Sequence, residues 1–369
     1  MLYNEQAGQP KRGSSLMSDK KQDAAARLQD TPEKAVLDGK VQFGRFGRPF
    51  RDLNLLEADC GIPRLLGLRR LRLKQWVHIA VIHHDWYLSL ALVDLGFLGT
   101  SWQHLFNRRT GQAFEHARKL PPGKFRAPEN VLDHSGKIET DGYRVSAHDH
   151  LDRQVHRFEI DVKEKGPLPA VSGTVTLHED PAQTQPLVVM LPLGPNRPMF
   201  SQKSTCPVSG ALDVGGEKVE FAPDRHVGLL DYHKAFYPRS TFWKWATFAT
   251  IDAAGDMLGC NLTHNVIRDD ARYNENCIWH GNRLSLVGAA RFEIPEDRMQ
   301  PWRIRTQDGA VDLELVPQGR RRERVNLGLV KSAYDQPYGL YSGTLVDSEG
   351  VRHSVDKSFG LAEDHVSLW

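Results

Sequence analysis

The chain has 369 residues, of which 40% are hydrophobic and 25% are charged, proportions typical of globular proteins. At roughly 100–200 residues per domain, this length favours two domains or one large domain. The 48 basic and 46 acidic residues nearly cancel and leave a net charge of +2. A surface so balanced has no general attraction for nucleic acid, and we expect no nucleic-acid partner.

The cysteines and the apolar segments bear on the compartment. None of the four cysteines belongs to a C-x-x-C pair, so we expect isolated thiols in a reducing environment. The N-terminal segment lacks the apolar core of a secretory signal. The longest apolar stretch, at residues 91–99, is interrupted by Asp94 and is far shorter than the roughly 20 residues of a membrane helix. These features predict a cytoplasmic protein and leave peripheral contact with a membrane open.

Residues 1–35 are polar and contain few large apolar side chains. Such a segment buries too little surface to offset the entropy lost on ordering, so we expect it to be disordered. From Leu71 onward, short apolar runs with a period of two replace this pattern. The runs are rich in Val, Ile, Trp, Tyr and Thr, which favour strands. The first two, Leu73–Ile82 and Trp86–Gly96, are separated by the turn-like His83–Asp85.

Turn signals recur at short intervals along the rest of the chain. Gly215–Gly216 separates two alternating runs in the way a two-residue hairpin does, and Asp252–Asp256 separates two more, as is typical of adjacent antiparallel strands. The sequence therefore predicts an all-β fold of antiparallel sheets joined by hairpins.

Two features bear on the domain division. Trp76 and Trp245 open similar hairpins in the two halves of the chain, which indicates either two sheets of similar build or a chance likeness. Residues 164–207 are rich in proline, which suits edge strands, loops and a passage between domains. We therefore predict an N-terminal β domain at residues 36–205 and a C-terminal β domain at residues 206–369.

The segment Asp231–Thr250 contains the strongest candidate for a ligand site. Side chains alternate along a strand, so Trp243 and Trp245 are expected on one face. Two indole rings there would form a flat wall for an apolar or cyclic ligand, or would stabilise a cation. The alternative is that both rings pack in the core or against a neighbouring strand.

Titratable candidates lie upstream of these tryptophans and near the C-terminus. Asp231, Tyr232 and Arg239 fall in a loop-like stretch, and loops carry function more often than cores do; the alternative is a solvated hairpin with a surface ion pair. Glu363 and His365 share a strand parity and form a candidate acid/base pair. The alternative is a tail that docks onto a sheet.

Further candidate ligand-binding residues come from two other segments. Asn261 and Asn276 offer amide groups that both donate and accept hydrogen bonds, and Trp279 follows them, although asparagines also suit turns. In the first half, Lys74 and Trp76 alternate onto one strand face. Lys74 can pair with a carboxylate on the next strand, which is usually a structural contact.

Other motifs argue against a metal or a cofactor. His148 and His150 form an H-x-H pair with His156 nearby, but the three or four ligands of a zinc site at defined spacing are missing. We find no Walker A loop, no G-x-G-x-x-G after a strand and no G-x-S-x-G elbow. The basic run Arg320–Arg324 is expected either to grip phosphate or a lipid headgroup or to form an exposed loop. We therefore expect neither a metal nor a cofactor.

Several blocks in order resemble the bacterial family called domain of unknown function 2804: LRLKQWVHIAV, GLLDYHKAFYPRSTFWKWA, NENCIWHGNRL, PYGLYSGTL and FGLAEDHVSLW. The resemblance covers residues 44–369 and implies no catalytic residues. A more distant similarity is to two-domain lipocalin-like proteins such as hydroxyneurosporene synthase and the tocopherol cyclases. It implies two packed lipocalin-like antiparallel β-barrels or half-barrels with a pocket for apolar, often isoprenoid, molecules.

Three functions follow as hypotheses. The first is an enzyme on an apolar, isoprenoid or lipid-like molecule, in which a protonated Asp231 or Glu363 protonates an alkene and hydration, cyclisation or isomerisation follows. The second is a non-catalytic lipid carrier or sensor with the same pocket. The third is a carbohydrate-binding protein, since paired tryptophans and asparagines also suit sugar rings. The sequence leaves open whether the protein is an enzyme, and leaves its oligomeric state open.

Overall fold

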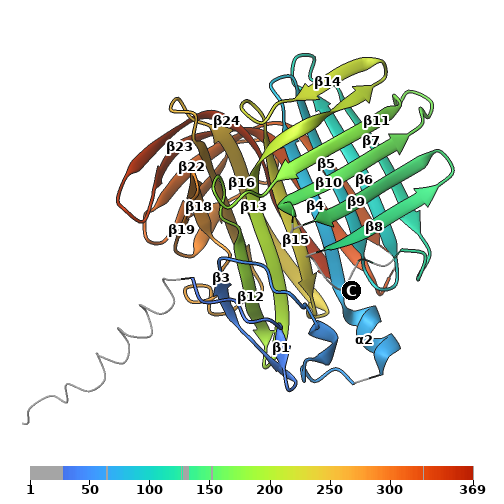
Figure 1. The fold of residues 1–369 in the computed structure, drawn as a ribbon, viewed down its shortest axis with the longest axis vertical. Coiled ribbons are helices and arrows are strands. Elements are labelled where there is room, and N and C mark those ends of the chain that lie inside the picture. The colour runs from blue at the N-terminus through green and yellow to red at the C-terminus, as the bar shows by residue number, and fades with distance from the viewer. Residues whose placement is uncertain are drawn as a thin grey trace, which may run out of the picture.

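The computed structural model describes residues 28–368 except 64, 126, 128–132, 151–152 and 327. Most of the described chain forms β-strands in two large antiparallel sheets. Figure 1 shows these sheets as two curled half-barrels lying side by side. The prediction of an all-β fold with two packed antiparallel half-barrels is confirmed (Figure 1).

The first sheet has thirteen strands and contains the N-terminal part of the described chain. Its main path follows the order β7 (Ala113–Leu120), β6 (Gly99–Asn107), β5 (Trp86–Asp94), β4 (Lys74–Ile82), β15 (Val227–Ala235), β13 (Arg197–Val214), β11 (Val171–His178), β10 (Val155–Val162), β9 (Tyr143–His150) and β8 (Asp133–Thr140). Outside this path, β13 also pairs with β12 (Leu187–Gly194) and β14 (Glu217–Phe221), and β12 pairs with β3 (Gly44–Phe46).

The second sheet has nine strands and contains the C-terminal part. Its order is β19 (Arg283–Leu286), β18 (Cys277–His280), β17 (Met257–Asn265), β16 (Ser240–Ile251), β24 (Arg352–Leu368), β23 (Lys331–Val346), β22 (Val311–Asn326), β21 (Trp302–Thr306) and β20 (Ala290–Glu293). The predicted turns are confirmed, because Gly215–Gly216 joins β13 to β14 and Asp252–Asp256 joins β16 to β17.

Smaller elements lie before β4. Strands β1 (Val36–Leu37) and β2 (Lys40–Val41) form a separate two-stranded ribbon, and the described helices are η1 (Leu55–Glu57) and α2 (Leu66–Arg72). Within the described ranges, no helix has the length and apolar character needed to cross a bilayer.

The two sheets are joined by an apolar seam. Tyr87 on β5 packs against Tyr338 on β23 and Phe359 on β24, with ring centroids 5.1 and 5.2 Å apart. Val227 and Leu229 on β15 belong to the same buried cluster. Burial of apolar surface from both sheets holds them together, since such burial contributes about 25 cal/mol per Å².

Strand β13 takes part in two regions of the first sheet. Its N-terminal half pairs with β12 and β15, and its C-terminal half pairs with β11 and β14. Gly210 lies in the second half with φ +117°, and an added Cβ there would lie 2.2 Å from the Thr174 carbonyl oxygen. Only glycine fits this close approach, which lets β13 continue between its partners.

Two predictions about the chain's organisation meet the structure differently. Of the segment predicted to be disordered, residues 1–27 lie outside the described residues. Residues 28–35 are ordered, contrary to prediction, because the Gln29 amide donates to the Arg45 carbonyl at 2.8 Å and Ala35 is fully buried. The predicted domain boundary after residue 205 falls inside β13, whereas the chain changes sheets between β15 and β16. Because a sheet is not by itself a domain, the domain division stays a prediction.

Alternation along β13 directs polar groups to both of its faces. Gln202 and Ser204 donate hydrogen bonds to Glu179, at 3.1 and 2.7 Å, and Lys203 between them points the other way. Glu179 also contacts Nε2 of His156 at 3.1 Å, and Asp149 contacts the Nδ1 of the same ring at 2.7 Å. Burial alone would lower the pKa of His156, but the two carboxylates outweigh it and raise that pKa to about 10. A buried imidazolium therefore links β10 to β9 and to the segment after β11.

We predict that this group makes stability depend on pH. Because the folded pKa of His156 lies above its unfolded value of about 6.5, its contribution is complete below pH 6.5 and is lost as the pH rises towards 10. The difference in free energy of unfolding between the wild type and His156→Gln should therefore shrink over that range, as urea denaturation would measure. His148→Gln, on the partly exposed face of β9, is the control. Parallel pH profiles for the wild type and His156→Gln would contradict the buried imidazolium.

Candidate functional site

A cavity of about 140 Å³ lies between the two sheets. Strands β4 and β15 of the first sheet and β16 and β24 of the second each contribute two side chains that are two residues apart. The cross-strand registers place these residues in facing ladders: His78 with Asp231, Trp76 with His233, Trp243 with His365 and Trp245 with Glu363. Six residues singled out from the sequence therefore line one cavity: Trp76, Asp231, Trp243, Trp245, Glu363 and His365.

Stacked rings from both sheets form an aromatic wall. The Trp76 indole lies parallel to the His233 imidazole, with centroids 4.3 Å apart and an interplanar angle of 5°. Trp76 also stacks with Trp243 at 5.6 Å and with Tyr237 at 6.1 Å, measured between ring centroids. The wall predicted for Trp243 and Trp245 of the second sheet is thus extended by Trp76 and His233 of the first sheet. Its apolar faces suit a planar or apolar ligand, or a cation.

A buried ion pair lies beside this wall. Lys203, which is 5% exposed, places Nζ 2.6 Å from Oδ1 of Asp231 and 4.7 Å from the centre of the Trp245 ring. Oδ2 of Asp231 accepts a hydrogen bond from the Trp76 indole at 3.1 Å. Burial alone would raise the pKa of Asp231, but the Lys203 ammonium outweighs it and holds that pKa below its usual range. Asp231 is therefore a carboxylate.

Glu363 has the opposite tendency. It accepts hydrogen bonds from Tyr334 and Gln336 on Oε1, at 2.6 and 2.8 Å, and from the Trp243 indole on Oε2 at 2.8 Å. Burial raises the pKa of Glu363 more than these donors lower it. Burial likewise raises the pKa of Glu275, which lies 3.9 Å from Lys203. The cavity thus contains an ionised aspartate and two glutamates whose pKa burial raises above the usual range.

The three histidines of the cavity are neutral. Burial lowers the pKa of His233 and His365 to about 3 and that of His78 to about 4. His365 contacts the Ser332 hydroxyl at 2.9 Å, whereas the hydrogen bonds of Glu363 go to other groups. Glu363 and His365 both line the cavity, and their role as an acid/base pair stays a prediction.

The basic run adds one residue to the site. It lies on strand β22 rather than in a loop, and alternation buries Arg321 while Arg320, Arg322 and Arg324 face Asp335. The Arg321 guanidinium lies 4.2 Å from the centre of the Trp102 ring and pairs with Glu115 at 3.1 Å. The predicted exposed loop is wrong, because the run lies on a strand. Contact of the run with phosphate or a lipid headgroup stays a prediction.

Six other predicted residues lie outside the cavity lining. Tyr232 points to the opposite face of β15 and packs against Phe200, and Trp279 donates to the Gln185 carbonyl at 2.8 Å. Lys74 donates to the carbonyls of Leu71 and Leu95 rather than to a carboxylate, and Arg239 is exposed. Asn261 and Asn276 act behind the wall: Asn261 accepts from the Trp245 indole at 2.6 Å, and Asn276 binds the Thr263 amide at 2.7 Å.

The loop-like setting predicted for Asp231 is wrong. Every residue of β15 is buried. The strand therefore has no solvent-exposed face, and its sequence lacks the alternation of apolar and polar residues that marks a half-exposed strand. The sequence reasoning also missed Lys203, Glu275 and Tyr334, which line the cavity. Lys203 stands in the polar stretch Ser201–Thr205 of β13, and that local pattern does not distinguish it from an exposed lysine.

Comparison with known families assigns the chain. The model of the family described as "Domain of unknown function (DUF2804)" matches residues 28–369. The chain belongs to this family. No curated protein sequence matches this DUF2804 member significantly.

Three solved structures have related folds. They are CghA with Sch210972 (TM-score 0.46, 11% identity, covering 80% of this chain and 88% of that one), kievitone hydratase from Nectria haematococca (0.48, 11%, 80% and 88%) and a putative AttH from Nitrosomonas europaea (0.43, 14%, 79% and 92%). At this level of similarity they carry no conclusion about what this DUF2804 member binds or converts.

We predict that the Lys203–Asp231 pair is essential to the site. Lys203→Met leaves buried carboxyl groups without their cation and should cost about 3–5 kcal/mol of unfolding free energy. Lys203→Met/Asp231→Leu removes both charges and should recover part of that loss, as measured by urea denaturation. Lys244→Met, at a partly exposed position on β16, should change stability little. A loss below about 1 kcal/mol for Lys203→Met would show that the pair is not held as described.

Proposed function

We propose that the protein is an acid–base enzyme that protonates a carbon–carbon double bond of a compact, largely apolar molecule in this cavity. The observation that carries the proposal is the opposed pKa shifts of two carboxyl groups that line one cavity, with Asp231 held ionised and Glu363 shifted towards the protonated form. Opposed shifts of this kind are how one site provides an acid and a base at neutral pH.

The contacts of Glu363 indicate which oxygen would carry the proton. Oε1 already accepts from both Tyr334 and Gln336, whereas Oε2 accepts only from the Trp243 indole. Oε2 therefore has a lone pair left for a proton that can be donated into the cavity. In the proposed step, the alkene π pair bonds to this proton, the O–H electrons stay on Glu363, and a carbocation forms.

The surroundings would stabilise that cation. The rings of Trp76, Trp243 and Trp245 line the cavity, and indole faces attract positive charge. The Asp231 carboxylate adds a negative charge. The cation is resolved in one of three ways: water adds and loses a proton, a second alkene of the same molecule attacks and the new cation then loses a proton from carbon, or the first cation loses a neighbouring proton directly. In each case the released proton goes to the carboxylate of Glu363, which gives hydration, cyclisation or isomerisation.

The dimensions favour a small ligand. A volume of about 140 Å³ is the space of roughly ten water molecules, at about 10–15 Å³ each on the same measure. This suits one substituted ring better than a long isoprenoid chain. Leu95, Thr100 and Glu323 line the cavity and are partly exposed, so we place its mouth beside them.

Glu275 offers a further polar contact. Its Oε2 lies 3.9 Å from Lys203. Burial raises the pKa of Glu275, whereas hydrogen bonding by the hydroxyls of Ser201 and Thr263 acts to lower that pKa. A substrate hydroxyl that reaches this carboxyl group would add a polar contact, which favours an oxygenated molecule over a pure hydrocarbon.

A carrier without catalysis would use the same cavity, and a first experiment separates the two. Native mass spectrometry of the purified protein followed by solvent extraction identifies any bound molecule. A ligand returned unchanged after long incubation in D₂O would support the carrier, and binding of soluble glycans instead would support a carbohydrate-binding protein. An enzyme of the proposed kind incorporates one solvent deuterium at carbon in each turnover.

We predict that Glu363→Gln abolishes this incorporation while ligand binding is retained within a few-fold. The amide keeps the shape of the side chain but cannot donate a carboxylic proton, so the loss in turnover should reach about 10²–10⁴-fold. Deuterium incorporation is followed by mass spectrometry, with circular dichroism as the folding check. Glu323→Gln, at the rim of the cavity, is the matched control and should keep near-wild-type activity. Full activity in Glu363→Gln would exclude Glu363 as the acid.

A further inference from the structure

Two histidines and three aspartates gather at one end of the second sheet. Asp252 and Asp256 lie in the turn between β16 and β17, and His280 ends β18. Asp347 follows the end of β23, and His353 lies near the start of β24. Potential ligand atoms of His280, Asp347 and His353 all lie within 4.8 Å of one another, as do those of Asp252, Asp256 and His280.

Both imidazole rings are already held by carboxylates. Nε2 of His280 lies 3.2 Å from Oδ2 of Asp252, and Nε2 of His353 lies 2.9 Å from Oδ2 of Asp347. The two ring centroids are 4.2 Å apart. Within the described ranges, these are the hydrogen bonds that the two rings make, so their Nδ1 atoms are not engaged by a backbone amide.

The two aspartates are held in place by backbone amides. Oδ1 of Asp347 accepts the amides of Glu349 and Val351, both at 2.9 Å, so that Oδ2 points towards His353. Oδ1 of Asp252 is held in the same way by two amides of its own turn. Two carboxylate oxygens are thus fixed beside two imidazoles.

A groove of about 600 Å³ runs past this cluster. Its lining includes His280 and Asp347, together with the carboxylates of Asp224, Asp256 and Glu349 and the guanidinium of Arg283. Four carboxylates therefore face one arginine, which makes the local potential negative and attracts cations. None of these residues lines the cavity between the sheets, so the groove is a separate site.

We propose that His280, Asp347 and His353, assisted by Asp252, bind a divalent first-row transition-metal ion at the edge of this groove. Imidazole and carboxylate ligands together suit Zn²⁺, Co²⁺ or Fe²⁺ better than Mg²⁺ or Ca²⁺. A metal bound through Nε2 of His280 takes Asp252 as a fourth ligand. A metal bound through Nδ1 leaves Asp252 to hold the Nε2 proton, an arrangement that orients many metal-bound histidines.

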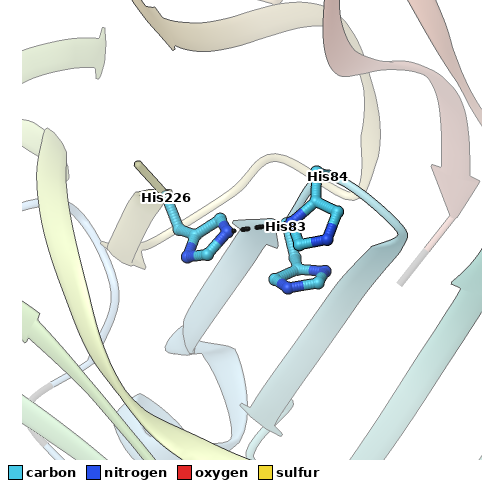
Figure 2. Close-up of side chains that lie close together, drawn as sticks. All are labelled: His83, His84 and His226. Carbon is cyan, nitrogen blue, oxygen red and sulfur yellow. Dashed lines mark hydrogen bonds between the residues drawn. The ribbon is translucent and has the colours of Figure 1, made fainter. Parts of the chain in front are cut away.

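A second histidine cluster in the protein shows what a poorer site contains. Figure 2 shows His83, His84 and His226 close together, and their candidate ligand atoms also lie within 4.8 Å of one another. However, Nδ1 of His83 accepts the Asp85 amide at 3.1 Å and Nδ1 of His226 accepts the Ala222 amide at 2.9 Å. An imidazole whose Nδ1 accepts a hydrogen bond carries its proton on Nε2, so neither ring has a nitrogen free for a metal.

The contacts of this second cluster are complete without an ion. Nε2 of His226 can donate to Nδ1 of His84 at 3.3 Å, and Nε2 of His84 reaches Oδ2 of Asp85 at 3.1 Å. The backbone amide of Ala222 thus starts a chain of hydrogen bonds that ends on a carboxylate. This second cluster provides the matched control for the metal site, because it also contains histidines whose candidate ligand atoms lie within 4.8 Å of one another.

The test uses the full chain, freed of metal with a chelator and titrated with Zn²⁺ by calorimetry. We expect one Zn²⁺ per chain, and His353→Asn and Asp347→Asn should each weaken binding at least about tenfold. His84→Asn should bind Zn²⁺ within about twofold of the wild type. Titration with Co²⁺ gives an absorption spectrum that reports nitrogen and oxygen ligands directly, and it should be lost in the same variants.

Several outcomes would overturn the proposal. They are no saturable Zn²⁺ binding by the wild type, unchanged affinity in both His353→Asn and Asp347→Asn, or loss of binding in His84→Asn. Melting temperatures of the metal-free variants, measured in the presence of chelator, separate loss of ligands from loss of fold. If His353→Asn is unfolded, Asp252→Asn, at a partly exposed position, provides a second variant whose Zn²⁺ affinity can be compared with that of the wild type.

Discussion

The buried pair of Lys203 and Asp231 is the interaction on which the rest of the cavity depends. Lys203 extends from β13 to its neighbour β15, and Asp231 in turn accepts the indole N–H of Trp76 on β4. Three adjacent strands are thereby joined through polar groups on a face that otherwise packs aromatic rings. Such a pair tolerates no missing member, because either charge alone would be stranded out of water. The same pair keeps Asp231 anionic, and the neutrality of the surrounding histidines follows from their burial.

The interface between the two sheets consists of two regions, the apolar seam and the cavity with its buried charged groups. At one end, Tyr87, Tyr338 and Phe359 exclude water and fix how the sheets meet. At the other, Trp76 of one sheet stacks with Trp243 of the other at 5.6 Å, and both rings line the cavity. The low polarity that stabilises the seam also raises the pKa of Glu363, so packing and acidity have one origin.

Much of the fold could be predicted from local patterns. The hairpin at His83–Asp85 follows from alternating runs around a turn, and Gly215–Gly216 follows from turn chemistry. Prediction failed where burial is complete on both faces, as on β15, because a fully buried strand shows no period. It also failed for residues 28–35, which pair with the segment from Arg45 to Asp52.

The candidate site could be predicted only in part, for a related reason. Pairs two residues apart, such as Trp243 with Trp245 and Glu363 with His365, are visible in one strand. Their partners come from other strands, and the register that brings Glu363 opposite Trp245 or Lys203 opposite Asp231 is a tertiary property. The basic run illustrates the same limit, since its sequence gave no sign that Arg321 and Glu323 line the cavity whereas the arginines between and beside them face Asp335.

The short link between β15 and β16 has a consequence for how such a protein can change. It joins the sheet that carries the ionised aspartate to the sheet that carries the protonatable glutamate. Neither sheet carries both carboxyl groups, so a duplicated or transplanted half-barrel would inherit only one wall of the cavity. The cavity is therefore a property of the packed pair of sheets and exists only where the two halves stay together.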